Sequence, residues 1–101
     1  MNKFLLIAGL FYVTPMHVNA DSTADLIAID SAFSQMSVEK GVQAAFNHYL
    51  ADDAVKLDGG AHAHYGRSAI VQTLPTLSPN VQLVWSPVQG KVAKSGDLGY
   101  T

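Results

Sequence analysis

The residue with the clearest chemical potential is Asp58, which stands between a short apolar segment and a pair of glycines. It follows Val55-Lys56-Leu57 and precedes Gly59-Gly60. A carboxylate removed from water is a stronger base, so Asp58 could abstract a proton if a pocket enclosed it. The competing interpretation is structural, because Asp beside Gly commonly caps a turn. Strand alternation would also place Asp58 on the side of Lys56, away from Val55 and Leu57.

Two histidines, His62 and His64, form a His-X-His pair after the glycine turn. In an extended segment both rings would point to one face, a spacing that can hold a metal ion. A complete site needs a third ligand, and the nearest candidates are His48 and Asp58. The competing interpretation is two exposed polar residues on a short hairpin. Since two histidines alone do not define a site, we predict no metal and no cofactor.

Four aromatic residues stand at positions that could line a ligand pocket: Phe33, Phe46, Tyr49 and Trp85. All of them also fall at core spacing, so plain core packing is the first interpretation. The two interpretations are compatible, because ligand pockets are lined mainly by apolar and aromatic side chains.

Two amphipathic helices are predicted to position these groups, over Thr23–Met36 and Val38–Leu50. Ser22 is the expected N-cap of the first helix, and the second is expected to begin just after Ser37. A third, short helix is predicted over about Arg67 to Leu74, ending before Pro75. The apolar residues that recur at helical spacing are Leu26, Ile29, Phe33 and Met36 in the first helix, and Val42, Ala45, Phe46, Tyr49 and Leu50 in the second.

Short strands are predicted to supply the surface that these helices cover. Val81 to Ser86 alternates clearly, with Val81, Leu83 and Trp85 facing one way. The other extended segments are Ala54–Asp58, Val88–Lys94 and a strand that begins at Leu98. Arg67 is expected to pair with Asp52 or Asp53, or to cap the third helix. The pattern predicts a single α+β domain.

Length, charge and the N-terminus limit the classes of function. The chain has 101 residues, no cysteine and a net charge of −2, without a basic cluster, so nucleic acid is not an expected partner. Lys3, the apolar run Phe4–Val13, the break at Pro15 and the small or branched residues of Val18-Asn19-Ala20 match a secretory signal peptide. The run is about half of the roughly 20 apolar residues that a membrane span needs. Residues 1–20 are therefore predicted to be a signal peptide, and 21–101 a domain that is periplasmic or secreted and free of the membrane after cleavage.

The stretch from Ala44 to Ile70, AAFNHYLADDAVKLDGGAHAHYGRSAI, resembles the front half of the nuclear transport factor 2-like fold, and within it the SnoaL-like domains. The resemblance implies a cone-shaped (cystatin-like) α+β fold. In it, N-terminal helices pack on a curved, mainly antiparallel sheet that encloses an apolar pocket. It implies further strands after Thr101, a small hydrophobic ligand and a homodimer. On this basis the chain is expected to be C-terminally truncated.

The ketosteroid isomerase relatives of this fold suggest a role for Asp58. In them a helix ends in Ala-Asp-Asp-Ala, and an Asp four residues further on is the general base. Ala51-Asp52-Asp53-Ala54 and Asp58 stand at the same offset here. The tyrosine that donates to the oxyanion in that family aligns best with Phe33, which has no donor. The sequence therefore favours an exported domain that binds a small hydrophobic molecule, with an isomerase- or polyketide cyclase-like enzyme as the alternative.

We predict that the exported form of the protein begins at Asp21. The reason is that Val18-Asn19-Ala20 presents small or branched residues where a signal peptidase cuts. N-terminal sequencing of protein recovered outside the cytoplasm checks this. Recovery of a chain that still begins at Met1 from the membrane fraction would instead identify an anchor.

Overall fold

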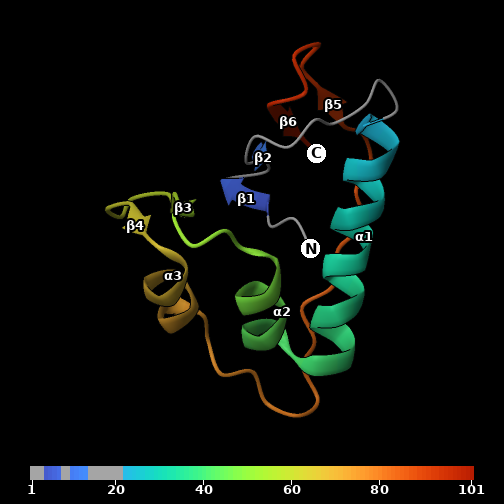
Figure 1. Ribbon diagram of the computed structural model, residues 1–101. Coiled ribbons are helices and arrows are strands. Elements are labelled where there is room, and N and C mark those ends of the chain that lie inside the picture. The colour runs from blue at the N-terminus through green and yellow to red at the C-terminus, as the bar shows by residue number, and fades with distance from the viewer. Residues whose placement is uncertain (1–3, 8–9, 14–21) are drawn as a thin grey trace.

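The computed structural model describes residues 4–7, 10–13 and 22–101 and shows a small α+β domain (Figure 1). In these ranges three helices accompany two small antiparallel sheets. The helices are α1 (Ser22–Lys40), α2 (Val42–Tyr49) and α3 (Arg67–Thr73). The strands are β1 (Phe4–Ile7), β2 (Leu10–Val13), β3 (Val55–Lys56), β4 (His64–Tyr65), β5 (Lys91–Val92) and β6 (Leu98–Tyr100). The α+β class predicted from the sequence is confirmed.

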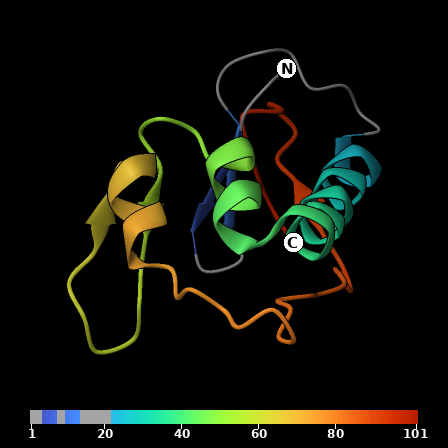
Figure 2. The same ribbon diagram turned by 90° about the horizontal axis from the view of Figure 1, so that it is seen from below.

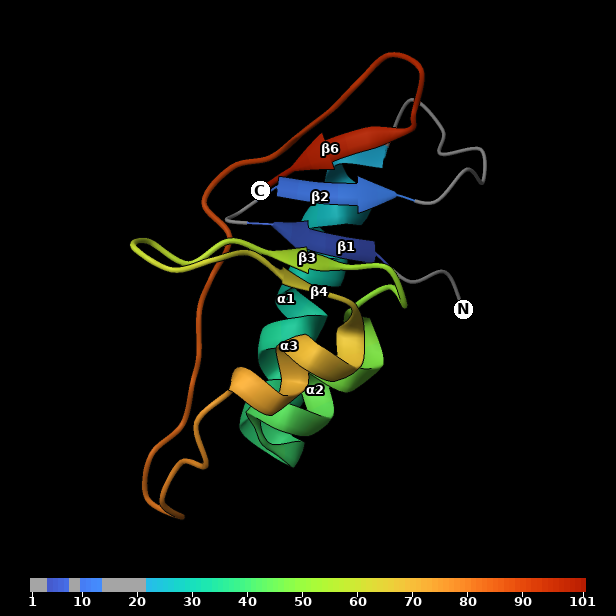
Figure 3. The same cartoon turned by 90° about the vertical axis from the view of Figure 1, so that its left-hand side faces the viewer.

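The larger sheet has the strand order β1-β2-β6-β5, and every neighbouring pair is antiparallel. Leu10 of β2 and Lys91 of β5 both pair with Tyr100, so β6 is the central link of this sheet. Strands β3 and β4 form a separate hairpin in which Val55 pairs with Tyr65. In Figure 3 the strands β6, β2, β1, β3 and β4 follow one another across one layer, and α1 passes behind it.

Helices α1 and α2 pack against each other across a break at Gly41 (Figure 2). Gly41 has a φ of 92°, in a region that side chains other than glycine rarely adopt. Its N–H donates to the carbonyl of Ser37, which closes the last turn of α1 at 3.0 Å. The predicted break at Ser37 was therefore too early: Ser37 is buried inside α1, and the chain turns four residues later.

One cluster of the apolar core lies where α2 and α3 meet the turn that leads into β3. It consists of Leu50, Ala51, Ala54 and Ile70, with Phe46 packed against them. Two backbone bonds fasten the start of α3 to this turn, from Gly66 N–H to the carbonyl of Ala54 and from Arg67 N–H to that of Asp52. The Arg67 guanidinium also pairs with the Asp52 carboxylate at 2.7 Å, one of the two partners expected from the sequence.

The segment 81–86 is extended, but it is not a strand of either sheet, so that prediction was wrong. After α3 the chain passes beneath α2 and then runs along α1 (Figure 1). Its hydrogen bonds go to helix side chains: Ser37 Oγ donates to the carbonyl of Leu83 at 2.7 Å, and Trp85 N–H donates to Ser34 Oγ at 2.8 Å. Serines of α1 thus take the place of a neighbouring strand. The alternation of apolar and polar residues could not show this, because an extended segment has the same alternation whether its backbone bonds to a strand or to helix side chains.

Part of the predicted signal peptide is described in the uncut chain as strands β1 and β2. The predicted cleavage site after Ala20 lies outside the described residues. Cleavage there would remove β1 and β2 and leave β6 paired with β5 alone. Among the described helices, none is long and apolar enough to cross a membrane.

Gly99 in β6 provides a test of how closely α1 packs on the sheet. A Cβ at this position would lie 2.7 Å from Leu26 Cδ2 and 3.0 Å from both the Lys91 carbonyl oxygen and Val92 Cγ2. Gly99→Ala is expected to lower the free energy of unfolding by about 1–3 kcal/mol, because overpacking forces these groups apart. Gly59→Ala is the matched control, with no atom within 4 Å of its Cβ. Urea unfolding measures both variants, and equal effects would contradict the packing described.

Candidate functional site

An aromatic cluster forms the floor of the candidate site. Phe33 of α1 is fully buried and lies at its centre. Its ring centroid is 4.8 Å from Phe46, 4.9 Å from Tyr49 and 4.9 Å from Trp85, with edge-on contacts to Phe46 and Trp85 and a stacked contact to Tyr49. All four aromatic residues proposed from the sequence to line a pocket are therefore brought together in one cluster.

A pocket of about 400 Å³ opens on one side of this cluster. Of the four aromatic residues, Phe46 and Trp85 are in its lining, whereas Phe33 lies behind them and Tyr49 stacks on Phe33. Val88 belongs to the lining and is 95% exposed. The described lining is mainly apolar and comprises Asp30, Phe46, Leu83, Trp85, Ser86, Pro87, Val88, Gln89 and Thr101.

Asp30 is the polar residue of this pocket that sequence reasoning missed. It is only 5% exposed, and each of its carboxylate oxygens accepts one hydrogen bond. Trp85 Nε1 donates to Oδ1 and Thr101 Oγ1 donates to Oδ2, both at 2.7 Å. A signal was present, because Asp30 stands four residues after Leu26 and three before Phe33, which places it on the same helical face.

Asp30, Ser34 and Ser37 together form a polar stripe along the buried face of α1. The stripe holds the backbone of Leu83 and Trp85 and the indole of Trp85, so it fixes the wall of the pocket. Buried polar groups need partners to offset their desolvation. Here polar side chains of α1 and groups of the extended segment are hydrogen-bond partners of each other.

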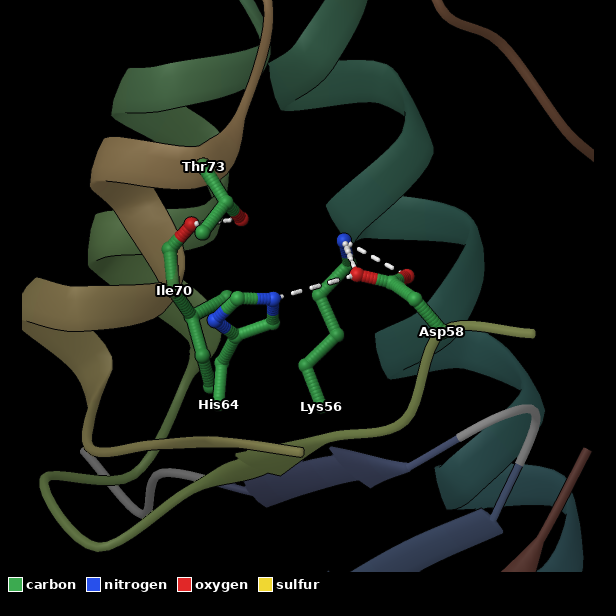
Figure 4. Close-up of polar contacts among 5 residues, drawn as sticks. All are labelled: Lys56, Asp58, His64, Ile70 and Thr73. Atoms are coloured by element: carbon green, nitrogen blue, oxygen red, sulfur yellow. Dashed lines mark hydrogen bonds and ion pairs between the residues drawn. The ribbon is translucent and has the colours of Figure 1, made fainter. Parts of the chain in front are cut away.

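Asp58 lies elsewhere, two residues after the end of β3 (Figure 4). Its carboxylate pairs with Lys56 Nζ at 2.8 Å and approaches His64 Nε2 at 3.5 Å. Its side chain is 38% exposed, and it is not in the lining of the pocket beside Trp85. Lys56 and Asp58 share one side, as strand alternation predicted. The role of Asp58 as a general base stays a prediction.

The two histidines of the His-X-His pair have different surroundings. His64 faces Asp58, whereas His62 is exposed on the hairpin loop. Within the ranges that the structure describes, no group of three or more metal-ligating side chains is gathered. His48, the other candidate third ligand, lies on α2 with its ring 4.8 Å from that of Tyr49.

A second hollow of about 410 Å³ lies between the start of α2 and the loop that follows α3. Its lining includes Lys40, Gln43, Ser78 and Val81. It is more polar than the pocket beside Trp85, and Lys40 is exposed. Leu83 borders both hollows, so the extended segment separates them.

Comparison with known proteins gives no relative: no family model, no curated protein and no solved structure matches the chain. The chemistry of the site therefore has to be argued from its own residues. The pocket can hold a small apolar body against Phe46, Leu83 and Trp85. At one end it presents a carboxylate that can accept a hydrogen bond or attract a positive charge.

Asp30 is buried and Asp58 is partly exposed, so the effect of removing each carboxylate tests the site described. Asp30→Ala is expected to lower the free energy of unfolding by about 1–3 kcal/mol, because it removes the acceptor of the Trp85 and Thr101 donors. Asp58→Ala removes the same charge from a half-exposed ion pair and is expected to cost less than about 1 kcal/mol. Urea unfolding measures both. A larger loss for Asp58 than for Asp30 would be incompatible with the site described.

Proposed function

We propose that this protein is an exported SnoaL-like domain that binds a small hydrophobic molecule in the pocket beside Trp85. The observation that carries the proposal is the pocket itself, about 400 Å³ with a mainly apolar lining and one buried carboxylate. Sites for small molecules typically combine an apolar lining with a few polar groups that fix orientation. All the described lining residues follow Ala20, so removal of a signal peptide would keep them in the chain.

The chain order supports the nuclear transport factor 2-like part of the proposal. From Ser22 on, after β1 and β2, two packed helices are followed by a hairpin, a third helix and antiparallel strands, the order that the resemblance implies for this part of the chain. The alternative, an isomerase- or cyclase-like enzyme with Asp58 as base, is less well supported. The Asp58 carboxylate is already paired with Lys56, and Asp58 is outside the lining of the pocket. The aligned oxyanion position is Phe33, which has no donor.

The test uses Trp85, the single tryptophan of the chain, as the reporter of binding. Cyclohexylmethanol is a suitable probe, since it is small, largely apolar and transparent where tryptophan absorbs. Its addition is expected to change the Trp85 fluorescence along a saturating curve. Three exposed valines of one segment then locate the site: Val88 lines this pocket, Val81 lines the second hollow, and Val84 lines neither.

Val88→Ser is expected to weaken probe binding about fivefold, because it removes roughly 1 kcal/mol of apolar contact with the ligand. Val81→Ser and Val84→Ser are expected to leave the affinity unchanged. Since Val81 and Val84 are 53% and 64% exposed, neither control should disturb folding. Weakening by Val81→Ser alone would move the site to the second hollow. A linear, unsaturable response of the unmodified protein would overturn the proposed function.

A further inference from the structure

Among the residues that the structure describes, none forms an ion pair with the buried carboxylate of Asp30. Within the described part of the chain, ion pairs join Lys56 and His64 to Asp58 and Arg67 to Asp52, and none includes Asp30. Asp30 also has the one charged side chain among the described lining residues of the pocket. An ionised group kept from water is costly unless a charge or sufficient hydrogen bonds compensate it. At this point the described residues supply two neutral donors, Trp85 and Thr101, and no cation.

The carboxylate also has unused capacity to accept hydrogen bonds. Two carboxylate oxygens offer about four acceptor positions, of which Trp85 and Thr101 use two. These two bonds fix the orientation of the carboxylate, because one donor holds each oxygen. The Asp30 carboxylate is therefore fixed in orientation and still has two acceptor positions for a ligand.

Aromatic rings stand beside this carboxylate. The rings of Trp85 and Phe46 line the same pocket, with centroids 6.4 Å apart and planes at 69°. The edge of the Trp85 ring meets the carboxylate through the indole N–H. A carboxylate together with aromatic walls is an environment that favours an ammonium group over a neutral or anionic one.

We infer that the ligand of this pocket is a small apolar amine, whose protonated nitrogen is bound by Asp30 and whose hydrocarbon body lies against Phe46, Leu83 and Trp85. The inference rests on the proposed function, since it names the ligand class of the same pocket. The ammonium group supplies the positive charge that the described protein residues do not. An anionic ligand of the same shape is repelled by Asp30.

Three probes of one shape test the inference on the intact protein at neutral pH and low salt: cyclohexylmethylamine, cyclohexylmethanol and cyclohexanecarboxylate. The amine is expected to bind at least about tenfold more tightly than the alcohol, the difference that a hydrogen bond to a charged group typically makes. The carboxylate is expected to bind most weakly. Saturable binding of the alcohol reports on the proposed function, whereas the ratio of amine to alcohol affinity reports on this inference.

Variants then assign the preference to Asp30. Asp30→Asn keeps the shape of the side chain and is expected to abolish the advantage of the amine while the alcohol still binds. Thr101→Val keeps the charge of Asp30 and the Trp85 bond to one of its oxygens, so the preference for the amine is expected to persist. This second variant keeps the test decisive if Asp30→Asn does not fold. Calorimetry measures the variants, because the indole of Trp85 itself contacts residue 30.

Equal affinity of the unmodified protein for amine and alcohol would overturn the inference and leave Asp30 as a structural clamp for Trp85 and Thr101. So would loss of the amine preference in Thr101→Val with the carboxylate still present. If none of the three probes binds, the proposed function fails together with the inference. If the alcohol binds and the amine has no advantage, the inference alone fails.

Discussion

The polar stripe on α1 is the constraint on which the rest of the structure depends. Asp30, Ser34 and Ser37 lie on the helix face that would ordinarily be apolar, and all three are buried. All three have partners 46 to 55 residues further along the chain, in the segment that carries Leu83 and Trp85. Asp30 also accepts a hydrogen bond from Thr101. Without these bonds the extended segment would have neither a strand nor a helix to satisfy its backbone at these points. The wall of the pocket is thus a consequence of side-chain hydrogen bonds to one helix.

Local features of the sequence predicted most of the secondary structure. Apolar spacing located the helices, and the glycine pair located the β3–β4 hairpin, because both signals depend on neighbouring residues only. The partner of the segment 81–86 could not be predicted in this way. Its alternation of apolar and polar residues fits a strand, but the donors and acceptors that it meets belong to α1. Asp30 was missed for a related reason: an acidic residue on an apolar face looks like an interruption until its buried donors are known.

The N-terminal apolar run shows a second limit of sequence pattern. An uncharged segment of this length fits both the hydrophobic part of a signal peptide and a pair of short strands. In the full chain Leu10–Val13 pairs with β6, whose other neighbour is β5. Export with cleavage would exchange that pairing for an open edge on β6, and open edges favour association with other strands. In that case the residues of β1 and β2 would direct export and would not be part of the folded, exported domain.

Two carboxylates of one chain show how environment, rather than residue type, sets chemistry. Asp58 has a lysine within 2.8 Å and is partly open to solvent, so its charge is compensated within the protein. Asp30 has two neutral donors, aromatic neighbours and a place in the lining of the pocket, and no ion pair among the described residues includes it. The desolvation cost of a buried charge has to be offset by an opposite charge or by hydrogen bonds. At Asp58 Lys56 supplies the opposite charge, whereas at Asp30 the pocket has space for a ligand that could supply it.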